Sequence, residues 1–228
     1  CIRDSILLDF DVYLNDEKLE IVDPYKYLWV IIDSNLRWQE HIDNLCKRIS
    51  VKLAILRRIK PFLPKKSLIT VYNSMILPLF DYACIVWSSC GEWNLRRLQV
   101  LQNKIMRVIL SAHYLTHSRD LLKELNFMSI NDRITYLCGC FVFRALNDLT
   151  PNYIKSKFVP VSRRHAHATR SSTNGNLQTC KFSTNYGKSS FRYKGAVTWN
   201  VICPNIRKTV SLNHFKKSLK DEFINWFE

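Results

Sequence analysis

The chain has 228 residues, of which 47% are hydrophobic, enough for one or two ordinary hydrophobic cores. No run of about 18 apolar residues predicts a membrane span, and we expect no signal peptide before the first predicted strand. Basic residues outnumber acidic residues by 34 to 19, a net charge of +15 that favours a polyanionic partner. The sequence opens with Cys1 and not with Met, so we expect a piece of a longer polypeptide.

The positive charge is concentrated in the last third of the chain. Residues 149–220 contain 14 Lys and Arg and no acid, interleaved with aromatic residues such as Tyr186 and Trp199. Residues 1–33, in contrast, carry eight acids and three basic residues. A solvated surface normally mixes both signs, so the acid-free segment indicates a surface for a polyanion. Nucleic acid is favoured as the partner over an anionic membrane or an acidic protein.

Two short β elements are predicted at the N-terminus. Apolar residues alternate along residues 6–22 around Asn15 and Asp16, a pattern typical of a β-hairpin. Residues 25–32 are mostly β-branched or aromatic and are followed by Asp33, which predicts a short strand. Together they would form a small antiparallel sheet that needs a partner to cover its other face.

The strongest helical pattern covers residues 38–60, where apolar side chains recur every three or four positions until Pro61. The opposite face and the following turn are basic, and no acid occurs between Asp43 and Asp81. These basic residues are Lys47, Arg48, Lys52, Arg57, Arg58, Lys60, Lys65 and Lys66. An ordinary exposed helix face is one interpretation of the pattern, and a contact with the backbone of a nucleic-acid duplex is the other.

Further helices are predicted at residues 64–78, 79–87, 93–109, 118–125 and 129–146. Ser118 and Ser129 are the expected N-caps of the last two helices, and Asp132 stands at the third helical position after Ser129, as in a capping box.

Residues 151–198 show no helical or strand period of useful length, and a final helix is predicted over residues 212–226. The expected fold class is therefore mainly α. A small N-terminal antiparallel β part precedes a helical bundle, and a basic, partly irregular C-terminal region ends in a helix.

Three segments resemble one known family. Residues 27–33 (YLWVIID) resemble the YLGV.(I/L)D segment in the reverse transcriptases of non-LTR (LINE-type, jockey- or CR1-like) retrotransposons, with Trp29 where that family usually has Gly. Residues 76–82 (ILPLFDY) and Trp87 resemble a later region of the same proteins, and residues 186–200 (YGKSSFRYKGAVTWN) resemble their C-terminal tail.

The resemblance implies a division into three parts. Residues 1–34 would be the end of the polymerase palm with its primer-grip hairpin, residues 35–115 a helical thumb-like domain, and residues 116–228 a helical and basic C-terminal extension. The expected partners are RNA and DNA, as template–primer, element RNA or target DNA. The palm and fingers of the parent polypeptide, and its endonuclease domain where it has one, are also expected partners, in the nucleus or the cytoplasm and without a membrane.

The same resemblance implies roles for individual residues. Tyr27, Leu28, Trp29 and Val30 would lie beside the primer end, and the basic face of residues 47–66 would follow the template–primer backbone. The remaining basic residues expected to contact nucleic acid are Arg96, Arg97, Arg163, Arg164, Arg170, Lys188 and Arg192.

The carboxylates that polymerase chemistry requires are not recognisable in this sequence. Polymerases hold two metal ions on adjacent carboxylates, and the family carries that pair upstream of the primer grip. Asp9 and Asp11 are separated by one residue and do not match it. We therefore expect the chain to be inactive alone, with no cofactor of its own, and Mg²⁺ only with the missing palm. The alternative is a helical protein-interaction scaffold, either a relic or domesticated, without a nucleic-acid function.

Other motif signals are weak. The spacings of the eight cysteines do not match a zinc finger, so reduced structural thiols are the favoured interpretation. His165 and His167 lack further ligands nearby, and Gly187-Lys188-Ser189 lacks the preceding glycine of a phosphate loop.

Overall fold

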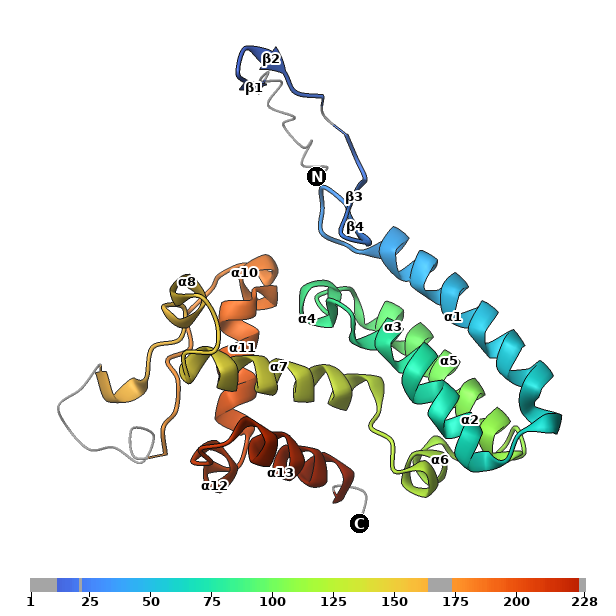
Figure 1. The fold of residues 1–228 in the computed structure, drawn as a ribbon. Helices are drawn as coiled ribbons and strands as arrows, with labels where there is room; N and C mark the ends of the chain where they lie inside the picture. Colours follow the sequence, from blue (N-terminus) through green and yellow to red (C-terminus); the bar gives the residue numbers. More distant parts are fainter. Residues whose placement is uncertain (1–11, 21, 164–173, 226–228) are drawn as a thin grey trace.

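The computed structural model describes residues 12–20, 22–163 and 174–225. The fold is mainly α, as the sequence predicted, and it consists of an N-terminal β arm and a helical body (Figure 1). Of the predicted site residues, Arg164 and Arg170 lie outside the described residues, as do Asp9, Asp11, His165 and His167.

The N-terminal arm holds two separate ribbons. Strands β1 (Tyr13–Leu14) and β2 (Glu17–Lys18) pair antiparallel, and so do β3 (Tyr25–Tyr27) and β4 (Val30–Ile32). The prediction of one continuous strand over residues 25–32 was wrong, because Leu28 and Trp29 have φ angles of 44° and 67° and form the turn of a hairpin. Two residues with positive φ are what a type I′ turn requires, and its twist suits the flanking strands.

The first part of the body forms one hydrophobic cluster. Its long helices, α1 (Gln39–Ile59) and α5 (Glu92–Leu110), pack along each other (Figure 1). The intervening and following elements are η1 (Lys60–Phe62), α2 (Lys65–Val71), η2 (Tyr72–Ile76), α3 (Leu77–Asp81), α4 (Cys84–Trp87) and α6 (Ser118–Leu125). The apolar stripe that predicted α1 is its buried face, since Ile42 and Ile49 are fully buried.

Two predictions in this part need correction. The helix expected over residues 79–87 is interrupted, because Ala83 has a φ of 50° and separates α3 from α4. Ser118 is not the N-cap of α6. His117 holds that position, and its side chain accepts a hydrogen bond from Arg119 N over 3.3 Å.

The backbone before Pro78 widens into the π-helical turn η2, since proline cannot donate the next helical hydrogen bond.

The second part of the body is built on α7 (Ile130–Leu146), whose first residue packs in the first cluster and whose later residues form a second cluster. Ser129 caps α7 as predicted, with its Oγ accepting from Asp132 N over 3.2 Å. The remaining elements are α8 (Asn152–Lys155), η3 (Val161–Arg163), α10 (Asn185–Ser189), α11 (Phe191–Val201), α12 (Pro204–Arg207) and α13 (Leu212–Asn225).

Helix α11 contradicts the expectation that residues 151–198 lack regular structure. Its buried positions include Gly195 and Ala196, and such small residues give little hydrophobic period. They instead allow close packing, because α11 and α13 both lie against α7. None of the helices in the described ranges has the length and apolarity needed to cross a membrane.

Candidate nucleic-acid interface

The β3–β4 hairpin is fixed to the body by a set of polar contacts. Ile31 N donates to His41 Nδ1 over 3.3 Å, and the Tyr82 hydroxyl donates to Leu28 O over 2.6 Å. Burial and the charge of Arg48 lower the pKa of His41, which favours the unprotonated Nδ1 that this bond requires. The hairpin is therefore held at the N-terminal end of α1.

The turn from the hairpin into α1 depends on Asp33. Its carboxylate accepts hydrogen bonds from Arg37 N and Trp38 N over 2.9 and 2.7 Å. The indole of Trp38 is buried and donates to Ser89 Oγ over 2.7 Å. These contacts fix the direction in which α1 leaves the hairpin.

The four predicted hairpin residues divide into two groups. The side chains of Tyr27, Leu28 and Trp29 are exposed, whereas Val30 is only 7% exposed and packs in the first hydrophobic cluster. Lys26 Nζ lies 4.0 Å from the centre of the Trp29 ring, a cation–π contact. The hairpin tip presents an aromatic and apolar surface, and Val30 anchors it.

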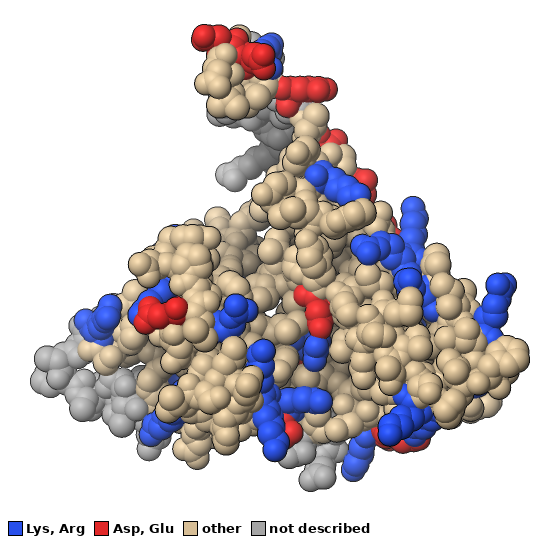
Figure 2. Space-filling view, in the orientation of Figure 1, with Lys and Arg blue, Asp and Glu red and all other residues tan. Residues whose placement is uncertain are grey.

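We call the cations of α1, η1 and the start of α2 the basic rim. Its members are Lys47, Arg48, Lys52, Arg57, Arg58, Lys60, Lys65 and Lys66. All are exposed except Lys52 and Lys60, which are half-buried. Lys65 forms an ion pair with Glu124 over 2.7 Å, and within the described part of the chain the other seven make no ion pair. Figure 2 shows basic side chains over the α1 side of the body and acidic ones on the arm.

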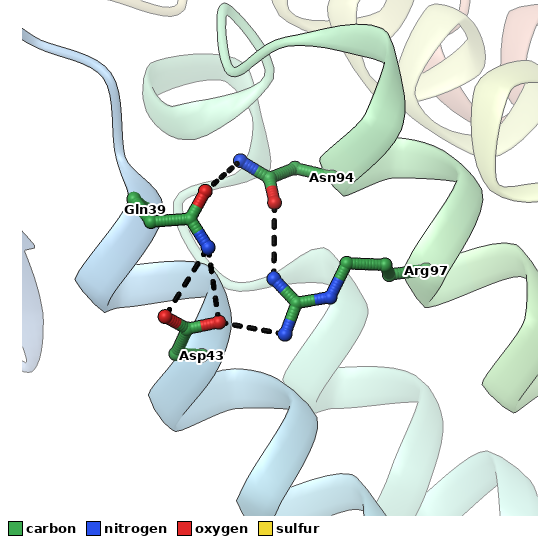
Figure 3. A network of polar contacts seen from close by, with 4 residues as sticks. All are labelled: Gln39, Asp43, Asn94 and Arg97. Atoms are coloured by element: carbon green, nitrogen blue, oxygen red, sulfur yellow. Dashed lines mark hydrogen bonds and ion pairs between the residues drawn. The ribbon is translucent and has the colours of Figure 1, made fainter.

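Arg96 and Arg97 occupy different environments on α5. Arg96 is exposed, whereas Arg97 Nη2 lies 2.6 Å from Asp43 Oδ1 and Arg97 Nη1 donates to Asn94 Oδ1 over 3.1 Å. Gln39 closes the network through Asp43 and Asn94 (Figure 3). Arg97 thus joins α5 to α1, while Arg96 is available to a ligand.

The described cations of the acid-free segment are partly used inside the fold. Arg163, Lys188 and Arg192 are exposed, in η3, α10 and α11. Lys194 is half-buried, and its Nζ donates to Ser88 O over 3.1 Å. Burial lowers the pKa of Lys194, although the neighbouring thiols of Cys90 and Cys138 act in the other direction.

The structure brings together four cations that the sequence did not predict to lie side by side. Lys104 and Arg107 on α5 line the same groove as Arg57 and Lys60 of the basic rim. The sequence shows only that both helices end in basic residues. Their proximity depends on how α1 and α5 pack.

A large cavity lies elsewhere, with a volume of about 850 Å³ between α3, α4, α7, α10 and α11. Its walls are mainly apolar, and the acid that lines it, Asp81, is held by Arg133 over 2.6 Å. Among the described residues no three His, Cys, Asp or Glu side chains gather as metal ligands.

Comparison with known proteins gives a distant match. The chain is 27% identical over 158 residues to "RNA-directed DNA polymerase from mobile element jockey" of Drosophila funebris, and 25% identical over 149 residues to the jockey protein of Drosophila melanogaster. It is 26% identical over 128 residues to "Probable RNA-directed DNA polymerase from transposon X-element" of Drosophila melanogaster. The chain is similar to reverse transcriptases of jockey-like non-LTR retrotransposons.

The matches to these jockey-like reverse transcriptases cover 68%, 64% and 54% of this chain, respectively. They cover 17%, 16% and 14% of the relatives, so the chain spans a small part of the length of each. No family model and no solved structure matches the chain. The family resemblance seen in the sequence is confirmed.

Proposed function

We propose that this chain is the thumb and C-terminal extension of a jockey-like reverse transcriptase, and that it binds a template–primer duplex along the basic rim. The similarity to polymerases named as RNA-directed supports the class of ligand. The observation that carries the proposal is the position of the rim: it runs along α1 from Lys47 onward, and the N-terminal end of α1 holds the hairpin with the exposed residues Tyr27, Leu28 and Trp29.

The dimensions of the rim suit a duplex backbone. Helix α1 has 21 residues and is therefore about 30 Å long, close to one turn of a nucleic-acid duplex. Its cations lie between Lys47 and Lys60, over about 20 Å of helix, and can neutralise successive phosphates of one groove edge. Such contacts carry no sequence information, so we expect binding that depends on salt and little on sequence.

The arm contributes to the direction of binding. The described arm and its junction to α1 carry Asp16, Glu17, Glu20, Asp23 and Asp33. These acids repel a polyanion from the arm, whereas the hairpin tip offers aromatic surface for the end of a strand. The duplex therefore lies along α1, with one strand end at the tip.

Titration of the 228-residue chain with a labelled RNA–DNA hybrid of about 20 base pairs tests this proposal by fluorescence anisotropy. We expect saturable binding at about 100 mM salt, and a linear fall of the logarithm of affinity with the logarithm of salt concentration. Absence of saturable binding at that salt concentration would overturn the proposal and favour the protein-interaction scaffold.

A further inference from the structure

We propose that the groove between the C-terminal ends of α1 and α5 is a binding site for single-stranded nucleic acid, next to the duplex surface. The cations of the groove would hold phosphates, and Tyr114 would stack on a base. This inference rests on the proposed function in requiring that the chain binds nucleic acid.

The groove has the size and lining of a phosphate site. Its volume is about 430 Å³, within the range of small-ligand pockets. It lies at the end of α1 away from the hairpin (Figure 1). The residues that line it are Arg57, Lys60, Lys104, Arg107, Val108, Ser111, Ala112 and Tyr114, so four cations and no acid face it.

The negative ends of the two helix dipoles do not neutralise the positive charge of the groove. The C-terminus of a helix carries roughly half a negative charge, so the ends of α1 and α5 together supply about −1. The four cations supply +4, and among the described residues none of them forms an ion pair. About three positive charges are left to attract an anion, enough for two or three phosphodiesters.

Arg107 is positioned with an unused donor. Its Nη2 donates to Thr116 O over 3.1 Å, which holds the guanidinium against the loop after α5. Its Nε is buried and meets no hydrogen-bond acceptor in the described part of the chain. A buried donor without a partner is destabilising. Because this Nε is closed to solvent, a phosphate in the groove meets the charge of the guanidinium and not the Nε atom itself.

Tyr114 supplies the feature that favours a single strand over a duplex. Its side chain is 73% exposed, and its ring centre lies 4.4 Å from that of His113. The loop is fixed by bonds from Thr116 N to His113 O over 3.0 Å and from Leu115 N to His113 Nδ1 over 3.3 Å. Bases in a duplex are stacked on one another, so an aromatic platform on a loop reaches only an unpaired base.

The groove is also continuous with the duplex surface, because Arg57 and Lys60 belong to both the groove and the basic rim. A strand that leaves a duplex lying along α1 can therefore pass into the groove without crossing an acidic surface.

Anisotropy with labelled ten-nucleotide oligo(dT) and oligo(U) tests the inference on the full chain. We expect Tyr114→Ala to weaken single-strand binding about tenfold and to leave binding of the RNA–DNA hybrid unchanged. Lys104→Gln should weaken single-strand binding and reduce its salt slope by about 0.7. The matched controls are Tyr153→Ala and Lys123→Gln, which remove an exposed tyrosine and an exposed lysine elsewhere.

The outcomes separate this inference from the proposed function. Hybrid binding together with single-strand binding that Tyr114→Ala leaves unchanged would overturn the groove as a single-strand site and leave the proposed function intact. Sensitivity to Lys104→Gln but not to Tyr114→Ala, with full competition by inorganic phosphate, would also overturn it, because it would indicate a simple anion site. If neither ligand binds, both proposals fail.

Discussion

Asp43 shows how a single residue changes the interpretation of a basic neighbour. Sequence reasoning placed Arg97 among the nucleic-acid contacts, but Asp43 holds it across the α1–α5 interface. Burial acts to raise the pKa of Asp43, but the hydrogen bonds from Arg97 and Gln39 and the charges of Arg97 and Lys47 together lower it. The depressed pKa is the sign of a pair that stabilises the fold.

We therefore predict that Asp43→Asn destabilises the chain at pH 7 and not in acid. The pKa of an aspartate in the unfolded chain is about 3.9, and that of folded Asp43 is lower, so its contribution is complete above about pH 4 and is lost as the pH falls through the folded value. Free energies of unfolding from urea titrations would show a difference between the two proteins of about 0.5–1 kcal/mol at pH 7, because both side chains are partly exposed. An equal difference at the acid end would contradict this.

Gln102 is the polar residue on which the α5 contacts depend most. It is 1% exposed, and its Nε2 donates to Met128 O over 2.9 Å and to the Tyr72 hydroxyl over 3.2 Å. Its Oε1 accepts from Gln99 Nε2 over 2.9 Å, and Gln99 Oε1 in turn accepts from Ile130 N over 2.8 Å. Burial raises the pKa of Tyr72 to about 12, which keeps that hydroxyl protonated.

We predict that Gln102→Leu lowers the free energy of unfolding by about 2–3 kcal/mol, because it leaves the Met128 carbonyl and the buried Tyr72 hydroxyl without their hydrogen-bond donor in a space of similar volume. Chemical denaturation measures the loss. Val100→Ala, at an exposed position of the same helix, is the control and should change it by less than about 0.5 kcal/mol. A neutral Gln102→Leu would show that the network contributes nothing to stability.

At the scale of elements, the sequence predicted the helices in which apolar residues recur with a clear helical period. Residues 38–60 and 93–109 correspond to α1 and α5, because their apolar stripes face one shared core. Helix α11 was missed, since its small residues carry little hydrophobic signal. The turn at Trp29 could not be predicted from residue propensities, because Trp is typical of strands and rarely adopts a positive φ. The φ angle of Trp29 is nevertheless 67°, a conformation that suits the glycine usual at this position in the resembling proteins.

Gly195 is the residue that determines how closely α11 packs. A Cβ added there would lie 2.9 Å from the Phe158 ring and 3.1 Å from Val142 Cγ2. Phe158 is buried and stands edge-on to Phe191, with ring centres 5.3 Å apart, so the ring has little freedom to withdraw.

We predict that Gly195→Ala destabilises the chain by about 1–3 kcal/mol, even though alanine is the better helix former by about 1 kcal/mol. Val201→Ala, which is exposed on the same helix, should be nearly neutral. Thermal unfolding monitored by circular dichroism gives both values. A Gly195→Ala protein as stable as the parent would contradict the close packing of α11 on Phe158.

At the scale of the whole molecule, the distribution of charge over the surface says more about where nucleic acid would bind than the net charge of +15 does. The composition predicted a polyanion partner, but it did not distinguish α1 from the acid-free segment as the main surface. The structure places part of the acid-free charge inside the fold, at Lys194 and at Arg207, whose Nη1 donates to Asn176 over 2.8 Å. The basic rim, in contrast, is mostly exposed and extends from α1 through η1 to the start of α2.

The most direct test of this account compares two variants of equal net charge for binding to an RNA–DNA hybrid across a salt series. One carries Lys47→Gln, Arg48→Gln and Arg58→Gln on the basic rim, and the other carries Lys181→Gln, Lys188→Gln and Arg192→Gln on the C-terminal region. We predict that the rim variant loses roughly 10- to 100-fold in affinity and that its salt slope falls by about 2–3, while the C-terminal variant stays close to the parent. The opposite ranking would contradict the account and move the duplex surface to the C-terminal region.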